Sequence, residues 1–212
     1  MKPSLDHSKR ESIKLRRLFF RKKEENVIGT EEDKPEMKYK YIVLKMSWDQ
    51  ALNVQEHIEK DIIENNNFLK NVKIRNFNPD IDADGFVRAY NRAFITAPDP
   101  YRSLTMNDIK HFNPDSTFVA ILYGKIIGFV FLTIEPLIKN GKEVGKQGVI
   151  AGLGVDPHYR RKKIGFLLGS RAAEFFSNSN VSELVCEVYH DNSVSYSFIR
   201  NFGFTRTGTI YI

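Results

Sequence analysis

The sequence GVIAGLGVDPHYRRKKIGFLLGSRAAEFF, which spans Gly148–Phe176, has the pattern of a strand, a turn and a helix. Its first part, Gly148–Val155, is a short apolar run of the kind found in buried strands, and Asp156-Pro157 ends it. An amphipathic helix is expected from about Ile164 to Ser177. Four successive cations, Arg160–Lys163, stand between the turn and the helix, and they point to a binding site.

These four cations are poorly placed for helix stability. A helix N-terminus already carries unpaired N–H groups and the positive end of the helix dipole, so cations are better placed at the other end. A bound polyanion would remove this conflict, and a pyrophosphate would suit the backbone amides. The P-loop pattern G-x-x-x-x-G-K-[ST] is absent, so a nucleoside-triphosphate site is not expected. A nucleic-acid patch, a nuclear-localisation-like signal and plain surface charge are the alternatives.

Residues 155–165, VDPHYRRKKIG, resemble the acyl-CoA-binding segment of the GNAT N-acetyltransferase superfamily. That segment is a strand with V-x-P-x-(Y/F), followed by (Q/R)-x-x-G-x-(G/A) at the start of a helix. Arg160 takes the Gln/Arg place, and Gly165 takes the final glycine place. Lys163 stands where the middle glycine is usual, so the chain departs from the family pattern at this position.

A second motif follows on the next strand and helix. The expected strand Glu183–His190 leads into NSVSYSFIRNFGF, residues Asn192–Phe204, which resembles the family's N-x-x-A-x-x-(F/L)-Y-x-x-x-G-F. Asn192 matches, Ser195 replaces the small alanine, and Ile199 replaces the tyrosine. Two motifs in order, on suitable elements, are more specific than either motif alone.

The resemblance implies that the strands Gly148–Val155 and Glu183–His190 run parallel and splay apart around acetyl-CoA, the implied cosubstrate. The loop before the helix would hold the pyrophosphate, and strand backbone would hold the pantetheine arm. No metal is implied. The implied cofactor-binding residues are Leu153, Gly154, Val155, Arg160, Arg161, Lys162, Lys163, Ile164, Gly165 and Asn192. Independently, glycines at 152 and 154 indicate a bulge, a close ligand or tight packing by another side chain.

The resemblance also implies an enzyme, an N-acetyltransferase that transfers an acetyl group directly to a primary amine. The amine needs a base, and the oxyanion needs a donor, for which the backbone N–H of Val155 is the candidate. Because Ile199 replaces the tyrosine that protonates sulfur, Tyr196 on the same helix is the candidate acid. Glu187 and Tyr189 share one face of a strand and are candidate bases. Core packing of the tyrosines and a surface ion pair of Glu187 are the alternatives.

The remaining pattern predicts an α/β (α+β) fold, with a GNAT-like central mixed sheet flanked by helices. Residues 72–212 are predicted to form the GNAT-like acetyltransferase domain, and residues 1–71 a basic, mainly helical N-terminal extension with a linker at Gly29–Lys38. The turn-rich loop Ala97–Tyr101 is a candidate frame for the acceptor. Further strands are expected at Tyr39–Lys45, Val72–Phe77, Phe118–Tyr123, Ile126–Glu135 and Phe204–Ile212, and further helices at Ser47–Glu64, Ile81–Phe94 and Ser193–Phe202.

Composition excludes several classes of protein. With 42% hydrophobic and 27% charged residues among 212, the chain is neither disordered nor collagen-like. The longest apolar run, Ile126–Ile134, is far short of the ~20 residues that cross a bilayer. The single cysteine, Cys186, excludes an internal disulfide and a Cys-rich zinc site. A cytoplasmic location is therefore expected.

Charge is concentrated in the first 27 residues. This segment holds nine of the 32 Lys and Arg residues and four of the 26 Asp and Glu residues, so it carries +5 of the total net charge of +6. Such a basic arm suggests nucleic acid or an anionic membrane surface as a binding partner. The alternative is a solvated helix or tail that binds neither. The acceptor, small molecule or peptide, and a homo-oligomeric state are left open. Two alternatives to the enzyme are a non-catalytic acyl-CoA-binding regulatory module and a nucleic-acid-binding protein that acts through the arm.

Overall fold

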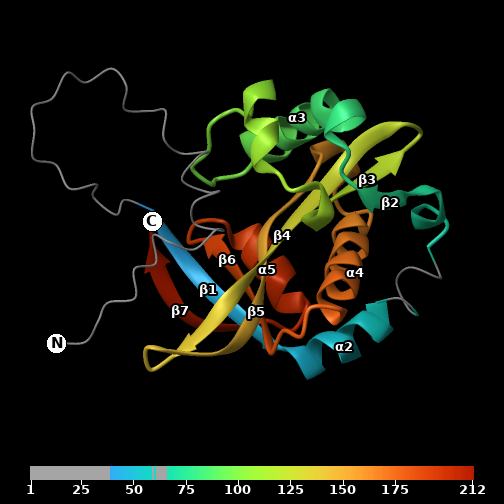
Figure 1. Cartoon of the computed structure of the whole chain (residues 1–212). Helices are drawn as coiled ribbons and strands as arrows, with labels where there is room; N and C mark the ends of the chain where they lie inside the picture. The colour runs from blue at the N-terminus through green and yellow to red at the C-terminus, as the bar shows by residue number, and fades with distance from the viewer. Residues whose placement is uncertain (1–38, 59, 61–65) are drawn as a thin grey trace, which may run out of the picture.

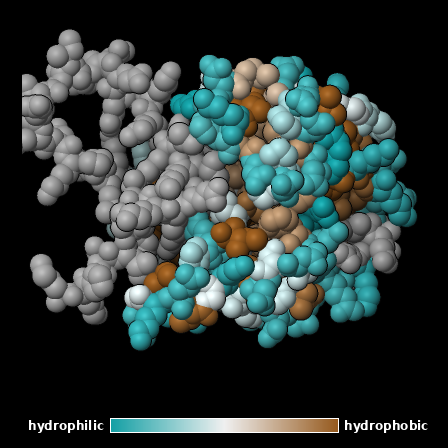
Figure 2. Space-filling view, viewed as in Figure 1, coloured by the Kyte–Doolittle hydropathy of each residue, from teal (hydrophilic) through white to brown (hydrophobic). Residues whose placement is uncertain are grey.

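The computed structural model of the chain describes residues 39–58, 60 and 66–212 (Figure 1). The predictions for the basic arm, for the linker at Gly29–Lys38 and for the end of the helix near Glu64 lie outside the described residues. No helix in the part that is described has the length and apolar character needed to cross a membrane. On the face drawn in Figure 2, hydrophilic residues cover most of the described surface, with hydrophobic residues scattered among them.

The described residues form a seven-stranded mixed sheet with the order β2-β3-β4-β5-β6-β1-β7. Every neighbouring pair is antiparallel except β5 and β6, which are parallel. The mixed sheet predicted from the sequence is therefore confirmed. In chain order the strands are β1 (Lys40–Ser47), β2 (Lys73–Asn76), β3 (Thr117–Leu122), β4 (Lys125–Lys139), β5 (Lys142–Val155), β6 (Glu183–Tyr189) and β7 (Thr205–Tyr211).

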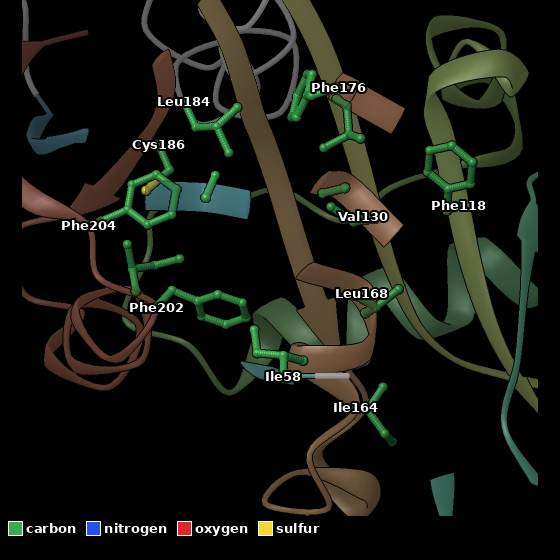
Figure 3. Packing of buried hydrophobic residues seen from close by; sticks show 14 of the residues in the cluster. Ile58, Phe118, Val130, Ile164, Leu168, Phe176, Leu184, Cys186, Phe202 and Phe204 are labelled. Atoms are coloured by element: carbon green, nitrogen blue, oxygen red, sulfur yellow. The ribbon is translucent and has the colours of Figure 1, made fainter. Parts of the chain in front are cut away.

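Helices cover both faces of this sheet. On one face α3 (Pro79–Ile95) packs on Phe129 and Phe131 of β4. On the other face the main core lies beneath α2 (Trp48–His57), α4 (Ile164–Ser177) and α5 (Ser193–Asn201). Figure 3 shows this core, in which Cys186 lies among large apolar side chains such as Leu184 and Phe204. Each helix thus buries an apolar stripe against the sheet, as the 3.6-residue periodicity requires.

The first strand lies inside the sheet rather than in an appendage. β1 pairs with β6 from Tyr41↔Tyr189 to Ser47↔Glu183, and its other edge pairs with β7. Leu44 at its centre is fully buried. The strand expected at Tyr39–Lys45 therefore belongs to the same sheet as the strands that follow residue 72. β1 has no local partner, and only pairing with distant strands can satisfy its backbone groups.

Local signals place the connections between elements. Ser47 and Gln50 form a capping box at the start of α2, with both reciprocal hydrogen bonds present. β4 and β5 run further than the predicted strands Ile126–Glu135 and Gly148–Val155. Asn140 and Gly141 both have positive φ angles and join the two strands in a tight hairpin. The segment after Thr105 is a 3-10 helix, Met106–His111.

Candidate active site

The sheet forks where β5 and β6 stop pairing. Their last paired residues are Ile150 and Cys186, whereas β5 continues to Val155 and β6 to Tyr189. A cavity of about 810 Å³ fills the fork and reaches the end of α3, the loop before α4 and the start of α5. The parallel, splayed strands expected from the sequence are therefore present.

The backbone of β5 faces this cavity at alternate residues. The Asp156 N–H donates to the Ile127 carbonyl at 2.9 Å, so the neighbouring pair, Gly128 and Val155, is a non-hydrogen-bonded pair. In such a pair the N–H and C=O groups point away from the partner strand. The backbone N–H of Val155 is therefore directed into the fork, and so is that of Leu153, two residues earlier.

The glycines of β5 are explained by phenylalanine packing. A Cβ atom on Gly152 would lie 2.1 Å from the Phe131 ring, and one on Gly154 would lie 2.3 Å from the Phe129 ring. Tight packing by another side chain therefore accounts for both glycines, and a register shift between Phe131 and Leu132 also puts a β-bulge next to Gly152. Gly154 lies between two residues whose backbone groups face the fork, so its own N–H and C=O point toward β4. These two groups are therefore not directed at a ligand in the fork.

Arg160 anchors the loop that precedes α4. Its Nη2 donates to the Ala93 carbonyl at 2.7 Å, and its Nε donates to the Val155 carbonyl at 3.2 Å. These bonds connect the loop to the end of α3 and to the tip of β5. The guanidinium is thus used mainly to position the loop, although Arg160 also lines the cavity.

The other three cations differ in where they point. The Lys162 Nζ lies 4.8 Å from the centre of the Phe68 ring, and Lys162 does not line the cavity. The Lys163 Nζ lies 5.2 Å from the centre of the Phe166 ring. Arg161 is exposed, lines the cavity, and has no side-chain hydrogen bond or ion pair with any described residue. Of the four, Arg161 is best placed to meet an anion in the cavity.

The loop backbone forms a cradle of amides at the start of α4. Arg161 and Lys163 have φ angles of 60° and 66°, and Lys163 is the N-cap residue without a side-chain cap. The N–H groups of residues 161–165 donate to no acceptor within the described part of the chain. A Cβ atom on Gly165 would lie 2.6 Å from the Phe198 ring, so glycine is needed for packing here too. Such a row of amides at a helix N-terminus suits an anion.

Glu187 lies at the base of the fork. It is the first residue of β6 beyond the last pair with β5, it is buried, and it lines the cavity. On its other side it pairs with Val43 of β1. Tyr189, the other candidate base, does not line the cavity; burial raises its pKa, and nearby Asp191 adds to the effect. Its partner Tyr41 lines the cavity instead.

The α5 helix presents Ile199 to the cavity, and not Tyr196, which was the candidate acid. Ile199 lines the cavity, whereas Tyr196 does not and packs against the main core. At 100° per residue the two positions lie about 60° apart around the helix, which is enough to turn Tyr196 away. The structure therefore does not bring Tyr196 to the site.

Asn192 links the start of α5 to the loop after α3 through its side-chain amide. Its Oδ1 accepts a hydrogen bond from the Ser195 N–H at 2.9 Å and so caps α5. Its Nδ2 donates to the Asp99 carboxylate in the loop after α3. Although it lines the cavity, both ends of its amide are occupied within the protein. It thus joins the two loops that frame the opening.

Sequence reasoning missed most of the aromatic and acidic part of the cavity wall. Tyr41, Tyr90, Phe94, Asp99 and Tyr101 all line the cavity. Burial raises the pKa of the Tyr90 hydroxyl far above its usual range, so it stays protonated at neutral pH. The turn-rich loop Ala97–Tyr101 was the one signal for this wall. No group of three or more metal-ligating side chains occurs among the residues described here.

The forked sheet and its amide cradle place the molecule among mixed α/β acyltransferase folds. Residues 84–204 match the model of the acetyltransferase (GNAT) family, and the chain belongs to this family.

Relatives by sequence carry acetyltransferase names. The chain is 29% identical over 147 residues to a mycothiol acetyltransferase of Amycolatopsis mediterranei, covering 65% of this chain and 48% of that protein. It is 28% identical over 114 residues to N-alpha-acetyltransferase 30 of Dictyostelium discoideum, covering 54% and 59%. The chain spans about half the length of the curated relatives it matches.

Solved structures support the fold. An aminoglycoside N-acetyltransferase in complex with CoA matches 66% of this chain and 92% of its own, with a TM-score of 0.54 and 19% identity. The ribosomal-protein-S18-alanine N-acetyltransferase of Escherichia coli matches 65% and 79%, with a TM-score of 0.50 and 16% identity. At these identities the likeness supports the architecture alone.

Proposed function

We propose that the chain is an acetyl-CoA-dependent N-acetyltransferase that transfers the acetyl group directly to a primary amine. The observation that carries this proposal is the pair of groups at the fork: a buried carboxylate, Glu187, on β6 and a fork-facing N–H, that of Val155, on β5. Direct transfer needs a proton acceptor for the amine and a donor for the oxyanion, and these groups supply one each.

The chemistry of the fork fits acetyl-CoA. The amides of residues 161–165 would hold the pyrophosphate, with Arg161 as the cation that reaches it. The fork-facing backbone groups of Leu153 and Val155 would pair with the amides of the pantetheine arm, much as a neighbouring strand would. Lys163 supports this fit, because it already holds the left-handed conformation that its main chain needs in the cradle.

In the proposed reaction, acetyl-CoA supplies an acyl group on a good leaving thiol. The amine nitrogen attacks the thioester carbonyl carbon, the C–N bond forms and the C–S bond breaks, giving the N-acetyl amine and CoA. Glu187 takes the proton that the amine loses, and the Val155 N–H donates to the carbonyl oxygen as negative charge develops on it. Because Ile199 offers no proton, the thiolate takes its proton from solvent.

The test is a steady-state assay of CoA release over a panel of primary amines with the wild type and Glu187→Gln. We expect kcat to fall about a hundredfold while acetyl-CoA affinity, measured by calorimetry, is retained. Glu183→Gln is the matched control, since Glu183 lies on the same face of β6, outside the cavity, and pairs with Lys45. Wild-type turnover that survives Glu187→Gln unchanged would contradict the assignment of the base.

A non-catalytic acyl-CoA-binding module is the second candidate. Ile199 at the cavity favours it, because the thiolate meets an apolar side chain there. Acetyl-CoA binding without turnover of any amine in the panel would support this module over the enzyme.

A further inference from the structure

Charged residues that line the cavity separate by sign. Among the described residues, the lining cations all belong to the loop before α4, at the end where the amide cradle lies. The lining carboxylates belong to the loop after α3, to β6 and to the turn after β6. The cations are Arg160, Arg161 and Lys163, and the carboxylates are Asp99, Glu187 and Asp191. The cations and the carboxylates that line this cavity thus stand on different elements.

The two inner carboxylates are held at separate places. Glu187 projects from the floor of the fork on the same sheet face as Val43, its partner on β1. Asp99 stands in the loop after α3 and accepts a hydrogen bond from Asn192. One carboxylate is therefore carried by a strand and the other by a loop, and both line the same cavity.

The loop that carries Asp99 is braced on both sides. The Asn91 side chain makes two hydrogen bonds with the Leu104 backbone, at 3.0 and 2.7 Å. The Tyr101 ring stacks on Phe94 with 6.2 Å between ring centres. Burial is the main cause of the raised pKa of the Tyr90 hydroxyl; the Arg102 cation opposes it, and the nearby charge of Asp99 adds a smaller raising effect. The negative charge of Asp99 is thus held beside the aromatic wall.

Aromatic rings also line this cavity, and Tyr90 among them lies near Asp99. Tyr41, Tyr90, Phe94 and Tyr101 contribute to the lining, and the faces of such rings attract cations. A carboxylate-bearing acceptor would meet Asp99 and Glu187 with like charge, which disfavours it. An acceptor with one amine and no other charge would use only one of the two carboxylates.

We propose that the acceptor is a primary amine that carries at least one further positive charge, as a diamine or polyamine does. This inference rests on the proposed function. The reacting amine must be neutral when it attacks: it first loses its ammonium proton to solvent, and Glu187 takes the second proton as the C–N bond forms, so the reacting nitrogen needs no counter-charge. Asp99 then remains to hold the second cationic group, with the tyrosine and phenylalanine rings beside it.

The experiment compares three acceptors of equal length at one pH: 1,5-diaminopentane, 1-aminopentane and 5-aminopentanoate. We expect kcat/KM to be at least about tenfold higher for the diamine than for the monoamine, after correction for its two equivalent amines. The amino acid should be the poorest of the three. Equal kcat/KM for diamine and monoamine, or a preference for the carboxylate, would overturn the inference while leaving the acetyltransferase itself in place.

The matched variant is Asp99→Asn, because the new amide oxygen can still accept from Asn192 while the charge is lost. It should abolish the diamine preference by raising KM for the diamine, with little change for 1-aminopentane. Asp115→Asn removes an exposed carboxylate outside the cavity and should leave the preference intact. A diamine preference that survives Asp99→Asn would overturn the role of Asp99. Failure of all three amines with a protein that binds acetyl-CoA would instead overturn the proposed function.

Discussion

The two sides of the fork differ in the groups that they present: backbone amides on one side and side chains on the other. The β5 side, with the loop of residues 160–165, offers mainly backbone amides from one continuous stretch of sequence. The opposite side offers side chains, among them Tyr41, Asp99 and Glu187, which come from β1, the loop after α3 and β6. A ligand with a constant structure suits the first kind of surface, and a variable acceptor suits the second. Substitutions on the two sides should therefore have different effects.

The largest expected effect is on the β5 side, at Gly154. Gly154→Ala would place a methyl group 2.3 Å from the Phe129 ring, which is itself fully buried, so the ring and the strand must shift. We expect the free energy of unfolding to fall by about 3 kcal/mol, measured by urea denaturation. Gly208→Ala is the control, because nothing lies within 4 Å of its new Cβ atom. Equal stability of the two variants would show that the backbone of β5 is not confined by these rings.

The next effect concerns the 3-10 helix Met106–His111, which follows the Ala97–Tyr101 loop, and depends on pH. Hydrogen bonds from Arg102 and Thr105 hold the pKa of Asp108 well below its usual range, despite burial. The stabilisation is therefore fully present above the unfolded-state pKa of about 3.9 and is lost as pH falls through the lower folded-state pKa. Asp108→Asn should remove about 2 kcal/mol at pH 7 and flatten the acid dependence of stability.

This acid dependence is measured by urea denaturation of the wild type and the variant between pH 7 and pH 2. A variant whose stability falls with acid as steeply as that of the wild type would contradict the role of Asp108. Asp115→Asn, in an exposed turn, is expected to change little.

A smaller effect separates two neighbouring cations on the cofactor side. Arg161→Ala should weaken acetyl-CoA binding about tenfold, or about 1.4 kcal/mol, because it removes a lining cation that makes no side-chain hydrogen bond or ion pair with any described residue. Lys162→Ala removes the same charge from a residue that lies over Phe68 and should weaken binding much less. Calorimetric titration gives both dissociation constants. Equal losses would mean that only the net charge of the loop matters.

The smallest effect tests the cradle backbone itself. Lys163 has a φ angle of 66°, a conformation that glycine adopts without the cost that a side chain imposes. Lys163→Gly should raise the free energy of unfolding by about 1 kcal/mol. Lys162→Gly is the control, since Lys162 has no positive φ and should gain nothing. A destabilised Lys163→Gly protein would indicate that the lysine side chain holds the loop.

The β5 side could be predicted from sequence because its signals are local. Strand, turn, cations and helix follow one another within residues 148–176, and the parallel partner strand is marked by its own motif. What the sequence did not reveal is why the glycines are there. Each of these glycines faces a phenylalanine on another element, 21 to 33 positions away in the chain. The glycines are Gly152, Gly154 and Gly165.

The acceptor side could not be predicted because it depends on long-range register. Tyr41 reaches the cavity only because β1 inserts between β6 and β7, and no local pattern specifies that insertion. The choice between Tyr196 and Ile199 depends on the rotation of α5 about its own axis, which is set by packing of Phe198 and Phe202. Sequence spacing alone therefore predicted that Tyr196 faces the cavity, which it does not.

The most direct test of the central claim, that backbone amides on the β5 side hold the cofactor, is an amide NMR titration with acetyl-CoA. We expect the largest chemical-shift changes at Leu153, Val155 and residues 161–165, with smaller changes at Gly154, whose N–H faces β4. Saturable binding with the largest changes elsewhere, or no binding at millimolar acetyl-CoA, would contradict the claim.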